Sequence, residues 1–208
     1  MTRVLMASGN LGKIRELESL FQDPRLELLS MKDFVPPGFD VEETGATFEA
    51  NARLKAVAVC EATGLPALAD DSGLEVDALG GRPGVYSARF AGPERDDGAN
   101  NRRLVQELEG VPEAERGARF RCVLALATPG TDSVEVVALA AGACEGRIVT
   151  TPRGKNGFGY DPYFSPLSDP QRTTAEMSAV EKNRISHRAL AAKELLPQLR
   201  RYLDQWLE

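Results

Sequence analysis

Two adjacent carboxylates at the end of an apolar segment are the first residues in the sequence that could do chemistry. Asp70 and Asp71 follow residues 65–69, whose apolar side chains predict a short strand. Successive side chains of an extended segment point opposite ways, so we expect one aspartate to face a site and the other to hold the loop. A carboxylate after a buried strand suits Mg²⁺, which prefers oxygen ligands. The alternative is a plain aspartate turn.

A glycine-containing loop near the start of the chain could bind phosphate. The segment SGNLGK, residues 8–13, lies between a predicted strand at 3–7 and a predicted helix at 13–21. Backbone N–H groups and a helix N-terminus attract phosphate, and Lys13 adds a full positive charge. The spacing is not that of a Walker A loop, and GxGxxG is absent. A simple strand-to-helix turn is the alternative.

Acidic residues also precede the next predicted helix. Glu42 and Glu43 come shortly before Thr47, which we expect to cap a helix running to about residue 62. The two glutamates are either solvent-exposed acidic residues at the start of this helix or the source of a second metal ligand. Lys55 lies on this helix, where it is either solvated or in reach of a phosphate.

Two later segments could recognise a base. GFGYDP, residues 157–162, places aromatic rings among glycines, and a base stacks on such a ring for about 1–3 kcal/mol. If Ser186 caps the last helix, His187 and Arg188 fall in its first turn, where positive charge opposes the helix dipole. That conflict indicates a bound anion or acceptor group. The alternatives are a packed aromatic turn and a structural histidine.

The elements that must position these residues alternate between strands and helices. We expect a strand at 26–30, a helix at 97–109 capped by Asp97, a hairpin of strands at 119–128 and 134–143, and a short strand at 148–149. Residues 152–166 are predicted to form an ordered loop, and Pro197 to begin a further helical turn that ends at Trp206. This order predicts an α/β protein with a mixed central β-sheet and flanking helices, as a single domain over residues 1–208.

Composition excludes several classes of function. The chain has 208 residues, a net charge of −6 and no basic run, which argues against binding to a nucleic-acid backbone. A single histidine excludes zinc sites built on two or more histidines, and the three cysteines are expected to be reduced and buried. The opening apolar run reads as a strand rather than a signal peptide, and no apolar stretch could span a membrane. We therefore expect a cytoplasmic protein.

Six segments in order resemble the signatures of the inosine triphosphate pyrophosphatase family, also called the Ham1 or non-canonical purine NTP pyrophosphatase family. They are SGNLGK, EETGATFEANA, ADDSGL, LGGRPGVYSARF, GFGYDP, and AEM followed by EKNRISHR. The resemblance implies hydrolysis of dITP, ITP and XTP to the monophosphate and pyrophosphate, dependence on Mg²⁺, and a homodimer. It also implies a mixed α/β fold whose two lobes flank a central active-site cleft.

The resemblance assigns roles to individual residues. Asp71 corresponds to the family's general base and, with Glu43, to its metal ligands. The residues implied to bind the nucleotide are Ser8, Gly9, Asn10, Leu11, Gly12, Lys13, Lys55, Ser72, Arg89, Phe158, Gly159, Tyr160, Asp161, Lys182, His187 and Arg188.

These residues support a mechanism in which water attacks the α-phosphorus and pyrophosphate leaves. Either Asp71 or Asp70 would take the proton from water. His187 and Arg188 would donate to the C6 carbonyl of hypoxanthine or xanthine and face the amino group of adenine unfavourably. The alternatives are a Maf-like nucleotide pyrophosphatase, a nucleotide-binding module without turnover, and a dinucleotide-dependent oxidoreductase, which the absence of GxGxxG disfavours.

Overall fold

The first third of the chain forms the predicted alternation of strands and helices. The computed structural model describes residues 1–205. The elements are β1 (Thr2–Met6), α1 (Leu11–Leu20), β2 (Leu26–Ser30), α2 (Phe48–Thr63) and β3 (Ala67–Val76). The Thr47 side chain accepts a hydrogen bond from the Ala50 N–H and caps α2, while Gly64 ends the helix in the left-handed conformation with φ of 67°.

Two boundaries in this part differ from prediction. Helix α1 begins at Leu11 rather than Lys13, because Asn10 already caps it by accepting from the N–H groups of Gly12 and Lys13. Strand β3 does not end at Ala69 but continues to Val76. Asp70 and Asp71 therefore lie within a strand and not in a turn behind it.

Residues 77–205 contain a long hairpin and three further α-helices. Its elements are α3 (Asp97–Glu107), β4 (Gly117–Pro129), β5 (Val134–Ile148), β6 (Phe164–Pro166), α4 (Ala179–Ile185) and α5 (His187–Gln205). The predicted hairpin is confirmed, with the Gly130 N–H bonded to the Ser133 carbonyl in its turn.

Several predictions in this part were wrong in detail. The side chain that caps α3 belongs to Asp96, whose carboxylate accepts from the Ala99 N–H, and not to Asp97. Ile148 ends β5 instead of starting a separate strand, and β6 lies inside the stretch predicted as loop. Pro197 is inside α5, which continues through it to Gln205. The predicted end at Trp206 lies outside the described residues.

The six strands form one sheet in the order β2-β1-β3-β4-β5-β6. β1 pairs in parallel with both β2 and β3, with Thr2 opposite Leu26 and Leu5 opposite Ala67. β6 pairs antiparallel with β5. The sheet is therefore mixed and flanked by helices, as the sequence predicts.

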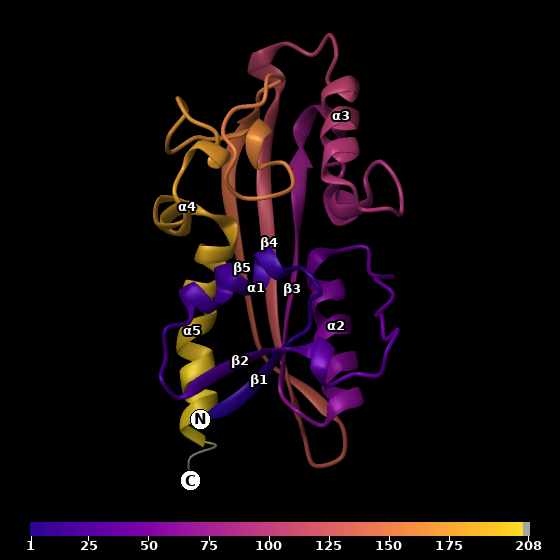
Figure 1. Ribbon diagram of the computed structural model, residues 1–208, viewed down its shortest axis with the longest axis vertical. Coiled ribbons are helices and arrows are strands. Elements are labelled where there is room, and N and C mark those ends of the chain that lie inside the picture. The colour runs from indigo at the N-terminus through magenta and orange to yellow at the C-terminus, as the bar shows by residue number, and fades with distance from the viewer. Residues whose placement is uncertain (206–208) are drawn as a thin grey trace. The chain divides into compact units, whose positions relative to one another are not determined.

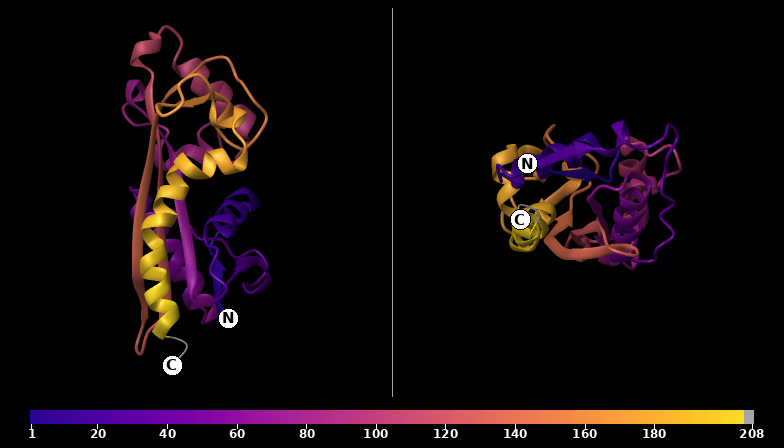
Figure 2. Two further views of the ribbon diagram at one scale, coloured as in Figure 1. Left: turned by 90° about the vertical axis from the view of Figure 1, so that its left-hand side faces the viewer. Right: turned by 90° about the horizontal axis from the view of Figure 1, so that it is seen from below.

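The chain divides into two compact units. Unit 1 comprises Met1–Asp71, Cys122–Gly142 and Arg188–Glu208, and unit 2 comprises Ser72–Arg121 and Ala143–His187. In unit 1, residues of α1 and α5, such as Leu17 and Leu199, pack with strand residues such as Val4, Leu68 and Leu124. α2 and α5 lie on different sides of the strands of unit 1 (Figure 1). The start of β1 and the end of α5 lie at the same end of that unit (Figure 2), where Asp204 pairs with Arg25.

Unit 2 has a core of its own. Leu74, Leu104, Ile148 and Phe164 are fully buried and belong to one apolar cluster, in which the rings of Phe120 and Phe164 lie 4.6 Å apart. Within residues 1–205, no helix has the length and apolar character needed to cross a membrane.

Candidate active site

The loop between β1 and α1 is closed by its own side chains. Asn10 Oδ1 accepts from the N–H groups of Gly12 (2.8 Å) and Lys13 (3.2 Å), and Ser8 Oγ accepts from the Asn10 N–H (3.2 Å). Gly9 and Leu11 are exposed. Three of the N–H groups in the predicted phosphate loop are thus engaged by side chains, which a phosphate would have to replace.

The two aspartates of β3 lie next to each other in sequence but in different surroundings. Asp70 is 1% exposed and Asp71 is 5% exposed. Alternation along the strand sends their carboxylates to opposite sides. The sequence predicted this division, although it placed the pair after the strand.

Asp70 is the centre of a buried charge network. Its Oδ1 pairs with Lys13 Nζ at 2.6 Å, and its Oδ2 pairs with Arg188 Nε at 2.7 Å. Oδ2 also accepts from Cys122 Sγ at 3.3 Å. Burial opposes ionisation of Asp70, but the charges of Arg188 and Lys13 outweigh it and hold the pKa of this carboxyl well below its ordinary value of 3.8. The carboxylate of Asp70 is therefore favoured in its charged form and is a poor proton acceptor.

Asp71 has a different partner and a free oxygen. Lys55 Nζ donates to Asp71 Oδ1 at 2.6 Å, to Glu43 Oε1 at 3.0 Å and to the main-chain carbonyl of Asp70 at 2.9 Å. Asp71 Oδ2 is buried and has no hydrogen-bond partner among the described residues. Burial raises the pKa of Asp71 above its ordinary 3.8, and the attraction of Lys55 offsets only part of the rise.

Lys55 lies between the two predicted metal ligands. Burial alone would lower the pKa of Lys55, but the charges of Asp71 and Glu43 outweigh that effect and raise it. Its ammonium therefore stays charged, and it holds the carboxylates of Glu43 and Asp71 close to one point.

Glu43 and Asp71 fit a magnesium ion in number and kind of donor. Mg²⁺ is commonly held by one or two carboxylates, with waters and substrate phosphates as its remaining ligands. The unpaired Asp71 Oδ2 is such a donor. Over residues 1–205, no group of three or more histidine, cysteine, aspartate or glutamate side chains is arranged to enclose a metal by itself.

Unit 2 holds a second cluster of predicted residues around Asp161, which is 2% exposed. Its Oδ2 accepts from Lys182 Nζ at 2.7 Å and from the Phe158 N–H at 2.9 Å, and its Oδ1 accepts from Thr174 Oγ1 at 2.7 Å. Lys182 Nζ also lies 5.2 Å from the centre of the Phe158 ring. The loop is thus ordered, as predicted, and it fixes the Phe158 ring beside an ammonium group.

Glycines allow this loop to close on Asp161. Gly157 has φ of +77°, and a Cβ there would lie 2.0 Å from Asp161 Oδ2. Gly159 has φ of +61°, its N–H donates to Asp97 Oδ2, and its carbonyl accepts from Asn101. The Tyr160 hydroxyl donates to the Ser87 carbonyl at 2.8 Å, and burial raises the pKa of Tyr160. Tyr160 is therefore a buried support of the loop.

The remaining predicted residues have varied surroundings. His187 is buried in unit 2, and its ring stacks on Phe120 at 4.8 Å. Arg188 is 1% exposed in unit 1, where it pairs with Asp70 and Glu16. Arg89 is partly buried and its guanidinium lies 5.1 Å from the centre of the Tyr86 ring, while Ser72 is a half-buried residue of β3.

Three residues that contact the predicted site residues were not identified as part of the site from the sequence. Glu16 lies one helical turn after Lys13 on α1, which was a usable signal because residues three apart share a helix face. Cys122 was predicted to be buried and reduced, and Cys60, Cys122 and Cys144 are all buried and free. No local pattern pointed to Thr174 or to the contact of Cys122 with Asp70.

The chain is similar to known proteins over nearly its whole length. Residues 4–198 match the profile of the Ham1 family. A dITP/XTP pyrophosphatase of Streptomyces avermitilis is 50% identical over 205 residues, which cover 98% of this chain and 100% of that protein. A protein of the same name from Bacillus licheniformis is 49% identical over 197 residues, which cover 94% of this chain and 96% of that protein. The solved HAM1 protein of Coxiella burnetii is 42% identical, with a TM-score of 0.84 over 97% of this chain and 100% of that one. The chain therefore belongs to the Ham1 family.

Proposed function

We propose that this protein hydrolyses non-canonical purine nucleoside triphosphates, namely dITP, ITP and XTP, to the monophosphate and pyrophosphate. The relatives named dITP/XTP pyrophosphatase support the reaction and substrate class. The observation that carries the proposal is the buried group of Asp71, Lys55 and Glu43, in which Asp71 keeps one oxygen unpaired. Removal of deaminated purines from the nucleotide pool follows from that activity. Membership of the Ham1 family does not favour a Maf-like enzyme or a binding module without turnover.

Glu43 and Asp71 are the residues proposed to hold Mg²⁺. A bound Mg²⁺ neutralises phosphate charge and orients the phosphates for attack. The fit rests on the donor set: two carboxylates held by one lysine, with an unpaired oxygen on Asp71. Depletion of divalent ions with a chelator is expected to abolish turnover, and added Mg²⁺ to restore it.

Asp71 is proposed as the proton acceptor. In the reaction the water oxygen forms a bond to the α-phosphorus, the bond from that phosphorus to the bridging oxygen breaks, and pyrophosphate leaves. Asp71 takes the proton that the water loses. Asp71 is favoured over Asp70 because its Oδ2 has no hydrogen-bond partner among residues 1–205, whereas both oxygens of Asp70 are committed to Lys13 and Arg188.

Lysines are proposed to balance the charge of the triphosphate. Lys55 contacts Asp71 directly, and the charge of Lys13 also acts on the Asp71 carboxyl, so both ammonium groups lie near the proposed proton acceptor. When phosphate oxygens bind, these ammonium groups gain new partners and stabilise the charge that develops on the leaving pyrophosphate. The backbone N–H groups of residues 8–13 are also proposed to stabilise the negative charge of the triphosphate.

Recognition of the purine is assigned to other residues. His187 is proposed to donate to the C6 carbonyl of hypoxanthine or xanthine, and Phe158 to contact the base. Ser72, Arg89, Gly159, Tyr160, Asp161, Lys182 and Arg188 remain predicted nucleotide-binding residues. Guanine shares the C6 carbonyl, so rejection of GTP must depend on the surroundings of its C2 amino group. A homodimer and a cytoplasmic location also remain predictions.

One assay tests the proposal. The purified protein is incubated separately with dITP, ITP, XTP, GTP, ATP and dTTP, with and without Mg²⁺, and pyrophosphate is measured against orthophosphate. We expect pyrophosphate from the first three with Mg²⁺ present. Release of orthophosphate, or equal turnover of ATP, would contradict the proposed function.

A further inference from the structure

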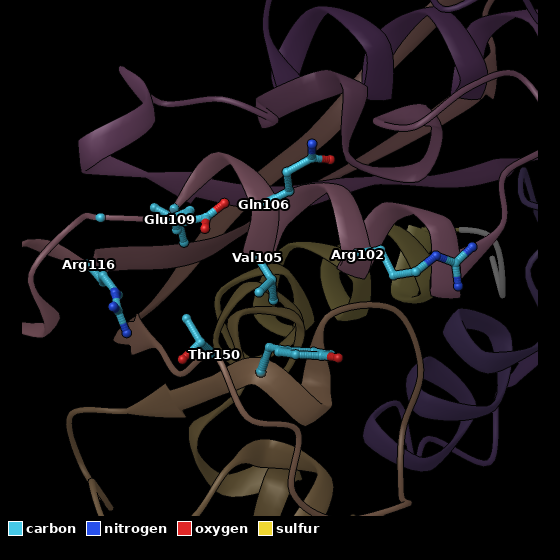
Figure 3. Close-up of a pocket in the computed structure, with 9 residues that line it drawn as sticks. Arg102, Val105, Gln106, Glu109, Arg116 and Thr150 are labelled. Carbon is cyan, nitrogen blue, oxygen red and sulfur yellow. The ribbon is translucent and has the colours of Figure 1, made fainter.

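Two adjoining cavities in unit 2 contain none of the residues proposed to bind the substrate. The first, of about 540 Å³, lies along α3. The second, of about 360 Å³, lies beside it, and Arg116 and Thr150 line both. Figure 3 shows Arg116 and Thr150 at one end of the first cavity and Arg102 at the other. We call them the α3 cavity and the arginine cavity. Each volume is in the range that holds a small-molecule ligand.

The arginine cavity is positively charged although the chain is acidic. Arg116, Arg147 and Arg153 line it, against the single carboxylate of Glu113. The chain as a whole carries a net charge of −6. A local excess of cations within an acidic protein attracts an anion to that place.

Much of the hydrogen-bonding capacity of these arginines is uncommitted. Within the described residues, Arg116 has one side-chain bond, from Nε to the Val111 carbonyl at 2.9 Å, and no carboxylate partner. Arg147 pairs with Glu113 at 3.3 Å, but its Nε is buried and has no partner there. Arg153 has more partners, because it forms an ion pair with Glu176 at 3.5 Å and donates a hydrogen bond to the Gln171 carbonyl at 3.1 Å. A guanidinium has five N–H donors in a fork that matches phosphate oxygens, so Arg116 and Arg147 retain donors for such a group.

Side-chain hydroxyls complete the polar lining. Thr150 and Thr151 both line this cavity. Two guanidinium groups and two hydroxyls are the donor set expected for a phosphate group.

The α3 cavity offers a different surface next to this one. Val105 and Tyr163 contribute apolar and aromatic surface, Glu109 adds one carboxylate, and Arg102 is exposed on the same helix. A planar ring packs favourably against such a wall. Because Arg116 and Thr150 belong to both cavities, a ligand could span them with its phosphate on the arginines and its ring beside Tyr163.

We propose that the two cavities form one binding site, separate from the proposed active site, for a small molecule that joins a phosphate group to an aromatic ring. A nucleoside monophosphate has this chemistry. The assignment rests on the uncommitted donors of Arg116 and Arg147, the two threonine hydroxyls and the adjoining apolar wall.

The test uses the whole protein and three probes: inorganic phosphate, adenosine and AMP. Binding is followed by NMR of the threonine methyl groups, because Thr150 and Thr151 report on this site and not on ligand bound elsewhere. We expect AMP to shift both signals and to bind more tightly than phosphate or adenosine. Arg116→Gln and Arg147→Gln are each expected to weaken AMP binding about tenfold, as for loss of a charge-assisted hydrogen bond.

Arg121→Gln is the matched control, because Arg121 carries the same charge in unit 2 but lines neither cavity and lies 4.0 Å from Glu75. It should leave AMP binding unchanged, and adenosine binding should be the same in all three variants. If Arg116→Gln disturbs the fold through loss of its bond to Val111, Arg147→Gln still decides the matter. Unmoved threonine signals at millimolar AMP, or equal AMP affinity in Arg147→Gln and Arg121→Gln, would overturn the proposal, as would AMP binding no tighter than phosphate.

Discussion

Asp70 and Asp71 are consecutive residues of β3, yet each binds a different lysine: Asp70 pairs with Lys13 and Asp71 with Lys55, both at 2.6 Å. The alternation of a strand separates the two carboxylates. Asp70 is further committed to Arg188, whereas Asp71 keeps Oδ2 unpaired. One sequence motif thus provides an electrostatic anchor and a candidate base.

Replacement of Asp71 by Asn should remove most of the activity while leaving the protein folded. Asparagine has the same shape but accepts no proton, and loss of a general base typically lowers the rate by about 10²–10⁴-fold. The measurement is kcat for dITP with Mg²⁺ present, together with a thermal unfolding curve. Near-normal turnover would remove Asp71 from the chemistry.

Replacement of Asp70 by Asn should instead lower stability. The substitution leaves Arg188 and Lys13 facing a neutral side chain in a buried site, and breaking a buried pair in this way costs about 3–5 kcal/mol. Urea denaturation measures the free energy of unfolding. A stability equal to that of the parent protein would show that the Asp70 network is not the anchor described above.

Acid sensitivity should depend on Glu181, which forms a capping box with Ser178 at the start of α4, the helix that carries Lys182. Its carboxylate accepts from the Ser178 N–H and hydroxyl and from Arg172, and these bonds lower its pKa from 4.5 to about 2. A lowered folded-state pKa contributes stability above pH 4.5 that is lost as the pH falls toward 2. The free energy of unfolding should therefore be higher for the parent protein than for Glu181→Gln above pH 4.5, and the difference should decrease as the pH falls toward 2. A difference that stays constant with pH would contradict this account.

The Phe158 loop should depend on Gly157 more than on Gly159. Both have left-handed φ, so alanine at either costs about 1–2 kcal/mol. At Gly157 the new Cβ would also meet Asp161 Oδ2, which adds about 1–3 kcal/mol, while nothing lies within 4 Å at Gly159. Gly157→Ala should lose more stability and show a higher KM for dITP. Equal effects of the two substitutions would mean that the bond between Asp161 and the loop does not determine its position.

Substrate choice should depend on His187. If His187 donates to the C6 carbonyl, His187→Ala should narrow the preference for ITP over ATP in kcat/KM by about tenfold, the value of one hydrogen bond. The His187 ring stacks on Phe120, so Phe120→Leu is a control that removes the stack and keeps the imidazole. An unchanged preference in His187→Ala would contradict the assignment.

The sequence predicted the elements well wherever local signals were strong. Thr47 and Gly64 are typical start and stop residues, and they bound α2 as expected. β3 was cut short because Asp70, Asp71 and Gly73 are poor strand formers, and burial within the sheet overrides that local preference. Pro197 was expected to begin a further helical turn, but it lies inside α5, which packs Leu195 and Leu199 into the core of unit 1.

Individual residues of the candidate site were predictable, but their partners were not. The motifs identified Lys13, Lys55 and Asp71 by their types and positions. That Lys13 binds Asp70 while Lys55 binds Asp71 depends on which side of β3 each helix covers, and spacing along the chain does not carry that information. The contact between Arg188 and Asp70 joins residues 118 positions apart.

The place of Lys55 between Glu43 and Asp71 has a consequence for the order in which ligands can arrive. Two carboxylates and one ammonium leave this group with a single negative charge. A divalent cation that enters by itself would make the net charge of this group positive and repel the Lys55 ammonium. A cation already bound to a polyanion would instead bring a new counterion for Lys55. If Glu43 and Asp71 hold Mg²⁺ as proposed, the Lys55 ammonium is therefore expected to favour entry of the metal–nucleotide complex over entry of the bare ion.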